Sequence, residues 1–227
     1  MSGHSATIWI GTSGWHYKHW LGKFYPERFA APKMLPFYCE CFDTVELNNS
    51  FYHLPKQTAL ECWRGTTPEG FCFAAKGSRF LTHMKKLKDP EQGLLRFFEA
   101  IEVLQHKLGP ILWQLTPNWA LDYERLANFI ALLPPYHRYS FEFRNTTWDT
   151  PEIYELLRRN NMAHCAFHLA GVQSPIEITA DFAYVRLHGP GGKYQGSYDD
   201  AALAAWAARI QIWAKDLKAV YVYFDND

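Results

Sequence analysis

Several features are scarce in this sequence, and each scarcity argues against a class of protein. No apolar run approaches the roughly 20 residues that a membrane-spanning helix needs. The first residues, M-S-G-H-S-A-T, lack the basic and apolar regions of a signal peptide. Lysine and arginine number 23, as do aspartate and glutamate, so the net charge is zero and any affinity for nucleic acid would have to be local. We therefore expect a cytoplasmic protein without a membrane partner.

Cysteine occurs in an odd number, which does not suit a disulfide framework. The five residues are Cys39, Cys41, Cys62, Cys72 and Cys165. In a chain without an export signal, this number predicts reduced and mostly buried thiols. The C-x-C spacing of the first pair fits neither a zinc knuckle nor a redox pair.

Nucleotide-binding motifs are also missing. No G-x-G-x-x-G follows the first β-rich run, where G-T-S-G-W-H-Y stands instead, and no tract has the spacing of a P-loop. Low-complexity segments and charged tails are absent too, so nothing in the chain indicates a linker. These absences favour a single domain that does not bind a dinucleotide.

Eight apolar, β-rich runs each end in a polar residue and give way to a loop. They are I-W-I-G-T-S, T-V-E-L-N-N, F-C-F-A-A-K, I-L-W-Q, Y-S-F-E-F-R, H-C-A-F-H, Y-V-R-L-H-G and V-Y-V-Y-F-D-N-D. Apolar residues at helical spacing lie between them, as in 94–108, 126–133 and 203–213. The pattern predicts an α/β fold, a (β/α)8 TIM-like barrel formed by residues 1–227, rather than an open doubly wound sheet.

We expect the barrel to lack its final, eighth helix. The sequence ends at Asp227, directly after the eighth β-rich run. We expect the apolar flank beside the first and last strands to be covered by a partner, such as a second copy of the chain, because an exposed apolar flank is unfavourable in a monomer.

Polar residues at the ends of the β-rich runs share a phase, so their side chains point to the same side. The pairs two residues apart are Glu46 and Asn48, Glu142 and Arg144, Arg186 and His188, and Tyr223 and Asp225. Lys76, Gln114 and His168 complete the set. In a TIM barrel these residues gather at the carboxyl ends of the strands, where the functional sites of the fold are built. Cations in this set indicate a site for a carboxylate or a phosphate, although a structural ion network would give the same pattern.

The tract H-G-P-G-G-K-Y-Q-G-S-Y-D-D after the seventh run is rich in glycine. Gly189 and Lys193 precede a helical pattern, and loops at this place in a barrel often bind phosphate through backbone N–H groups. Tyr198 in the same tract, together with Trp148, would stack on a sugar or a base. A flexible surface loop without a ligand is the alternative, since the P-loop spacing is absent.

These residues favour a hydrolase or lyase that acts on a phosphorylated or carboxylated small molecule. Glu142 would be its general acid or base, and His188 a proton shuttle beside Asp225. The expected substrate-binding residues are Glu46, Asn48, Lys76, Gln114, Arg144, Trp148, Arg186, Gly189, Lys193 and Tyr198. We expect no metal, because nearby lysine and arginine oppose a divalent ion, and no other cofactor.

Two other functions are compatible with the same residues. A non-catalytic module would hold nucleic acid or a metabolite through the glycine-rich tract and the aromatic residues. A glycoside hydrolase would use Glu46 and Glu142, about 5 Å apart for retention or about 6.5 to 9.5 Å apart for inversion. The neighbouring arginines oppose the second function, because they would depress both pKa values and weaken the acid.

The chain resembles a known family along nearly its whole length. The tracts that carry the resemblance are G-T-S-G-W-H-Y-K-H-W-L-G-K-F-Y-P, F-D-T-V-E-L-N-N-S-F-Y-H-L-P, F-A-A-K-G-S-R-F-L-T-H, L-W-Q-L-T-P, F-E-F-R-N-T-T-W, Y-V-R-L-H-G and V-Y-V-Y-F-D-N-D. They are similar to the YecE-like domain of unknown function, a TIM-barrel family. The resemblance implies the barrel, but it implies no established reaction. It also implies motif positions at Glu46, Asn48, Lys76, His83, Gln114, Glu142, Arg144, Trp148, Arg186, His188, Gly189, Tyr198 and Asn226.

The chain departs from that family pattern at two points. Family members look as if they continue past the last strand into a further helix. Asp225 also stands where the family pattern leads us to expect asparagine, which adds a charge to the predicted site.

Overall fold

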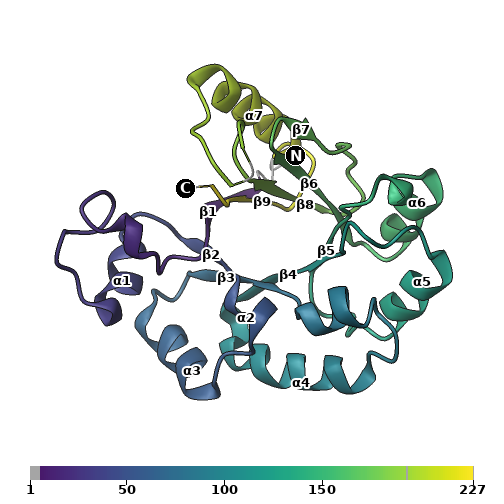
Figure 1. The fold of residues 1–227 in the computed structure, drawn as a ribbon, viewed down its shortest axis with the longest axis horizontal. Helices are drawn as coiled ribbons and strands as arrows, with labels where there is room; N and C mark the ends of the chain where they lie inside the picture. Colours follow the sequence, from purple (N-terminus) through teal and green to yellow (C-terminus); the bar gives the residue numbers. More distant parts are fainter. Residues whose placement is uncertain (1–5, 193, 227) are drawn as a thin grey trace, which may run out of the picture.

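The computed structural model describes residues 6–192 and 194–226. Within these residues, eight parallel strands close into a barrel in the order β5-β4-β3-β2-β1-β9-β8-β6, and pairing of β5 with β6 completes the ring (Figure 1). The strands are β1 (Thr7–Ser13), β2 (Thr44–Leu47), β3 (Cys72–Lys76), β4 (Leu108–Gln114), β5 (Tyr139–Glu142), β6 (Ala163–Leu169), β8 (Phe182–Leu187) and β9 (Ala219–Phe224). Each predicted run overlaps one of these strands, so the predicted TIM-like barrel is confirmed.

The helices surround this barrel (Figure 1). They are α1 (Ala31–Tyr38), α2 (Asn49–Tyr52), α3 (Gln57–Thr66), α4 (Glu91–Ile101), α5 (Tyr123–Ala131), α6 (Pro151–Arg159) and α7 (Asp200–Trp213), with short helices η1 (Lys18–Trp20), η2 (Phe80–Met84), η3 (Glu102–Lys107) and η4 (Thr146–Trp148). Two of them begin at residues that favour helix starts. Asp199 accepts a hydrogen bond from the N–H of Ala202 at the start of α7, and Pro151 occupies the first position of α6.

The helical pattern predicted for 94–108 is too long at its end. Gln105 has φ 55°, a left-handed conformation that interrupts the helix, and Leu108 already belongs to β4. The apolar side chain of Leu108 therefore packs from a strand, because strand and helix residues can face the same core.

The sixth strand is not followed by a helix, contrary to the predicted repeat. The chain instead forms the short strand β7 (Val172–Gln173), antiparallel to β6, and then runs without regular structure to β8. Ile176 and Ile178 on this segment pack against the apolar cluster between the barrel and α7. An extended segment thus covers the flank that a helix usually covers in this fold.

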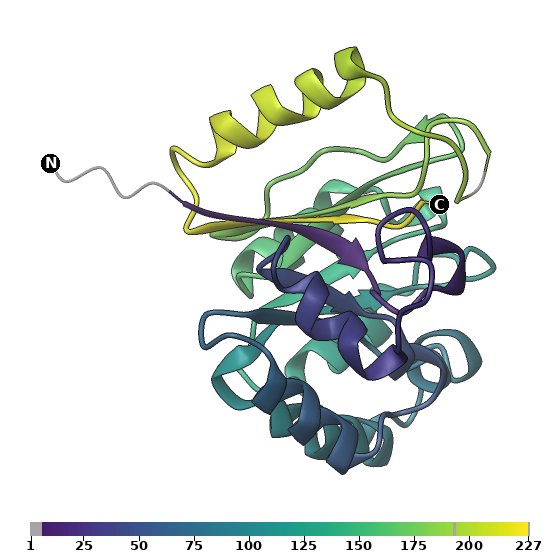
Figure 2. The same ribbon diagram turned by 90° about the vertical axis from the view of Figure 1, so that its left-hand side faces the viewer.

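The outer face of β1 lies between α7 and α1 (Figures 1 and 2). Ile8 and Ile10 point outward there and are 41% and 46% exposed. In contrast, α7 covers the outer residues Val220 and Val222 of β9. The exposed isoleucines lie on the flank where we predicted a partner, and that partner stays a prediction.

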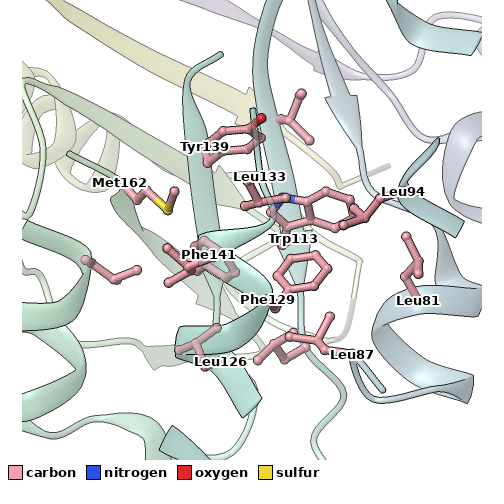
Figure 3. Packing of buried hydrophobic residues seen from close by; sticks show 14 of the residues in the cluster. Leu81, Leu87, Leu94, Trp113, Leu126, Phe129, Leu133, Tyr139, Phe141 and Met162 are labelled. Atoms are coloured by element: carbon pink, nitrogen blue, oxygen red, sulfur yellow. The ribbon is translucent and has the colours of Figure 1, made fainter. Parts of the chain in front are cut away.

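The largest apolar cluster lies between the barrel and helices α4 to α6, and Trp113 of β4 is at its centre (Figure 3). The Trp113 ring packs against Phe97 and Phe129, with centroids 5.2 and 5.0 Å away. A Cβ atom at Gly77 would lie 2.2 Å from the same ring. Glycine is therefore required directly after Lys76, the last residue of β3.

The prediction of mostly buried cysteines is wrong for part of the set. All five thiols are free, but Cys41 and Cys62 are exposed and Cys39 is half-buried. Cys41 lies just beyond the end of α1, and Cys62 lies on the solvent face of α3, where Leu60 is the buried residue. Only Cys72 and Cys165, both on barrel strands, are buried.

Candidate functional site

Arg186 of β8 is the centre of a charged network inside the carboxyl end of the barrel. Its side chain is fully buried, and its Nε and Nη2 atoms donate to Glu46 Oε1 and Oε2 at 2.9 and 2.7 Å. Its Nη1 donates to Glu142 Oε2 at 2.9 Å, and Nη2 also donates to Asp225 Oδ2 at 2.9 Å. One guanidinium thus binds three carboxylates that come from different strands.

Glu142 at the end of β5 is fully buried and fully bonded. Besides Arg186, it accepts hydrogen bonds from Arg144 Nε and, at 2.8 Å, from Gln114 Nε2. Burial by itself raises the pKa of Glu142, but Arg144 and Arg186 outweigh it and hold the pKa well below its usual value. The carboxylate therefore stays ionised and is a poor general acid.

His188 completes the network through contacts with Arg144 and Asp225. Its Nε2 lies 2.9 Å from Arg144 Nη2, which can only donate, and its Nδ1 lies 3.0 Å from Asp225 Oδ2. The ring is therefore neutral with its proton on Nδ1. Burial and the charge of Arg186 lower the pKa of His188, which agrees with a neutral ring. We call these residues the Arg186 network: Glu46, Gln114, Glu142, Arg144, Arg186, His188 and Asp225.

A cavity of about 790 Å³ opens above the Arg186 network, and we call it the mouth pocket. Aromatic rings form part of its walls, and its polar lining carries more cationic than anionic groups. The aromatic residues are Phe51, Tyr52, Phe143, Phe167 and Tyr194, and the ionisable residues are Lys76, Arg79, His83, Arg144 and Asp149. A concave apolar cavity with a few convergent polar groups is the usual form of a small-molecule site.

Lys76 reaches the mouth pocket from the end of β3. Its side chain is only 8% exposed, and its Nζ lies 4.2 Å from the centre of the Phe51 ring. Among residues 6–192 and 194–226, Nζ has no hydrogen-bond or ion-pair partner. Burial and the nearby charge of Arg186 lower the pKa of Lys76 to about 8.

The predicted site residues fall into different layers. Lys76, Gln114 and Arg144 line the mouth pocket. Glu46, Glu142, Arg186, His188 and Asp225 do not line it and form the network beneath. Asn48 lies just beyond β2, and its Oδ1 is buried without a hydrogen-bond partner among the described residues. The roles predicted for these residues stay predictions.

Of the remaining predicted residues, Trp148, Gly189 and Tyr198 support the structure around the pocket. Trp148 is a correction: it is fully buried and donates to the carbonyl of Trp119 at 2.7 Å, so it packs in the core instead of stacking on a ligand. Tyr198 accepts from the N–H of Gly189 at 3.1 Å and braces the glycine-rich tract. Lys193 lies outside the described residues.

Arg79 and Asp149 line the mouth pocket but were not among the predicted residues, and His83, which also lines it, was indicated only by the family resemblance. Arg79 and His83 follow Lys76 in the tract K-G-S-R-F-L-T-H, and His83 lies on η2, a π-helix. The alternation of side chains along a strand identifies site residues only on strands. The prediction based on it therefore missed these positions, which lie outside the strands. The turn of η2 is the wide turn of a π-helix, and π-helices are frequent at functional sites. This signal for His83 appears only in the structure.

His164 of β6 makes the stability of the fold sensitive to mild acid. Burial lowers the pKa of His164 to about 4, whereas an unfolded histidine titrates near about 6.5. Between these values the unfolded chain binds a proton that the folded chain does not, so the free energy of unfolding falls as the pH is lowered. Urea unfolding at pH 7 and at pH 4.5 should show a loss of about 2 to 3 kcal/mol from this group.

The variant His164→Gln should lose less stability between these pH values than the parent. The exposed His53 is the matched control, and His53→Gln should keep the parent's pH dependence. His83 is half-buried, and its burial likewise lowers its pKa to about 4. It therefore adds to the loss of stability in the parent and in both variants. Equal pH dependence in His164→Gln and the parent would contradict this assignment.

Neither a metal cluster nor a membrane span is found in the described part of the chain. No group of three or more histidine, cysteine, aspartate or glutamate side chains is arranged there to hold a metal ion. None of its helices has the length and apolar character needed to cross a bilayer.

The fold and the site define a (β/α)8 barrel protein with a buried arginine network beneath an aromatic pocket at the carboxyl ends of its strands. The chain belongs to the family described as "Protein of unknown function DUF72", which matches residues 9–227. The resemblance to the YecE-like domain of unknown function is thereby confirmed.

Two curated relatives carry the description UPF0759. YunF of Bacillus subtilis is 27% identical over 97% of this chain and 89% of its own length. YecE of Escherichia coli K12 is 24% identical over 74% of this chain and 58% of its own length. Neither name states a reaction.

Two crystal structures of DUF72 family proteins share the fold. The one from Thermotoga maritima has a TM-score of 0.88 and 27% identity, and covers 97% of this chain and 92% of its own. The one from Enterococcus faecalis has a TM-score of 0.80 and 18% identity, and covers 99% of this chain and 92% of its own. The second likeness concerns the fold alone.

Proposed function

We propose that this protein is an enzyme of the lyase or hydrolase class that binds a small carboxylated or phosphorylated molecule in the mouth pocket. The observation that carries the proposal is the state of Lys76. This buried ammonium group faces the pocket and has no acceptor oxygen among the described residues, although buried cations normally have one. An anionic ligand in the pocket would supply that oxygen.

The other cations of the pocket suit the same ligand. Arg79 is exposed at the rim, and Arg144 is held from below by Glu142 and His188. The plane of Arg144 also packs 4.6 Å from the Phe167 ring, which fixes its direction. An immobilised guanidinium binds carboxylate or phosphate at a small entropic cost, because little freedom remains to be lost.

The Arg186 network has a positioning role in this proposal. Glu142, His188 and Asp225 were predicted as catalytic residues, but each is bonded to an arginine and none lines the pocket. We assign to them the orientation of Arg144 and the electrostatic balance beneath Lys76. A glycoside hydrolase is disfavoured, because Glu46 and Glu142 both bind Arg186 and neither is available as a proton donor.

Titration with phenyl phosphate or phenylacetate tests the proposal, since each carries an anion and a ring that fits the aromatic walls. Isothermal titration calorimetry should show saturable binding to one site. Arg79→Gln should weaken that binding about tenfold, the value of one charge-assisted hydrogen bond. The substitution is on an exposed residue, so the fold should persist.

The matched control is Lys33→Gln, which removes an exposed cation from α1, far along the chain from the pocket lining. It should leave the affinity unchanged. Equal affinity of the parent and Arg79→Gln for both probes, or no binding at all by the parent, would contradict the proposal.

A further inference from the structure

We propose that the amine of Lys76 forms an imine with the carbonyl carbon of a carboxylated substrate held in the mouth pocket. The inference rests on the proposed function, because the pocket must first bind the anion. It specifies the covalent bond that forms between the enzyme and its substrate. It also narrows the class of substrate to a keto acid or an aldehyde acid.

Comparison with Lys107 shows why Lys76 differs from a structural lysine. Both side chains are buried, at 5% exposure for Lys107 and 8% for Lys76. Nζ of Lys107 donates to the carbonyl oxygens of Arg64 and Thr67 at 2.7 and 2.8 Å, which compensates its burial. Lys76 has no such acceptor in the described chain, and it borders a cavity that a substrate can enter. An accessible amine in an apolar pocket is the arrangement that nucleophilic lysines need.

The charges around Lys76 come from four other strand ends. Arg186 on β8 opposes protonation of the amine, together with burial, while Glu46, Glu142 and Asp225 favour it. The resulting pKa of about 8 leaves about a tenth of the amine neutral at pH 7. An ordinary lysine, with a pKa of about 10.4, is almost wholly protonated at that pH.

The segment after β3 places a neutral base near the same amine. Both groups contact Phe51, whose ring centre lies 4.2 Å from Lys76 Nζ and 5.0 Å from the ring of His83. Burial and the charges of Lys76 and Arg79 lower the pKa of His83 to about 4, so its imidazole is neutral at pH 7. A neutral imidazole can accept the proton that the amine loses on addition.

The step balances without a further reactant. The Nζ lone pair forms a bond to the carbonyl carbon, and the carbonyl oxygen takes a proton to give a carbinolamine. The C–O bond then breaks, and the oxygen leaves as water with the two hydrogens of the amine. Protonation of the imine nitrogen by solvent gives an iminium ion. When a hydroxyl group on the β-carbon of the substrate loses its proton to solvent, the bond between the α and β carbons breaks, its electron pair moves to the iminium group to give an enamine, and the β-carbon leaves as an aldehyde. Protonation of the enamine carbon and attack of water on the iminium carbon then release the shortened keto acid and free Lys76. The lyase class follows from this chemistry.

Reductive trapping tests the inference on the full chain. The protein is incubated with phenylpyruvate and sodium cyanoborohydride at pH 7.5, and the intact mass is measured. We expect one reduced adduct per chain, and peptide mapping should place it on Lys76. Lys76→Met should abolish the adduct, whereas the exposed-site control Lys33→Arg should retain it. If Lys76→Met does not fold, the peptide map of the parent protein decides.

The outcomes separate this inference from the proposed function. An adduct spread over exposed lysines, or none at all, overturns the imine. If phenylacetate still binds in that case, the anion-binding proposal stands. If trapping is not observed and neither phenylacetate nor phenyl phosphate binds, both proposals fail.

Discussion

Replacing Arg186 with methionine is expected to lower the free energy of unfolding by about 3 to 5 kcal/mol. The guanidinium is fully buried and bonded to Glu46, Glu142 and Asp225, so its loss leaves buried carboxylates without their main counter-charge. Urea unfolding at pH 7 measures the effect. Methionine fills a similar volume, so the loss of stability reports charge more than packing.

The triple variant Glu46→Gln, Glu142→Gln, Arg186→Met separates charge from packing. Removing two carboxylates together with the arginine should recover part of the lost stability, because the uncompensated charges are gone. Unchanged stability in Arg186→Met would show that the network is not the structural centre described here. No recovery in the triple variant would show that packing dominates the effect.

Gly189→Ala is expected to destabilise the glycine-rich tract by about 1 to 3 kcal/mol through backbone strain alone. Gly189 has φ 98°, and a Cβ atom there would lie 2.2 Å from the backbone oxygen of Gln195. Relieving that contact moves the backbone, which breaks the hydrogen bond from the Gly189 N–H to Tyr198. His188 directly precedes Gly189, so its contacts with Arg144 and Asp225 in the Arg186 network should weaken as well.

Gly191→Ala is the matched control in the same tract. A Cβ atom at Gly191 would meet nothing within 4 Å, and its φ is not in the left-handed region. Urea unfolding should place Gly191→Ala within about 0.5 kcal/mol of the parent, as for other surface substitutions. Similar stability of the two variants would contradict the strain assigned to Gly189.

Much of the fold can be predicted from the order of residues. The eight β-rich runs are apolar, short and regularly spaced, and parallel strands buried on both sides have this character. The failures lie where local pattern is weak. Segment 170–181 contains Gly171 with φ 76° and an exposed strand pair, and no periodicity distinguishes such a segment from a loop before a helix.

The candidate site was predicted only in part, because strand parity gives the side of a strand but not the depth of a residue. Glu142 and Lys76 both end strands and carry charge, yet one is fully bonded below the pocket and the other lines it. Arg79 was missed because it lies three residues beyond its strand. Trp148 was misplaced because an indole can stack on a ligand or pack in a core with the same sequence neighbours.

The sequence by itself determined the barrel and the rim on which the charged residues gather, since hydrophobic periodicity and the parity of strands are local properties. Only the tertiary structure decided which charges neutralise one another and which one is left facing the pocket. The physical reason is that pairing depends on distances between strands far apart in the chain. Arg186 meets Glu46 across 140 positions of sequence. Lys76 has no acceptor among the residues that the structure describes.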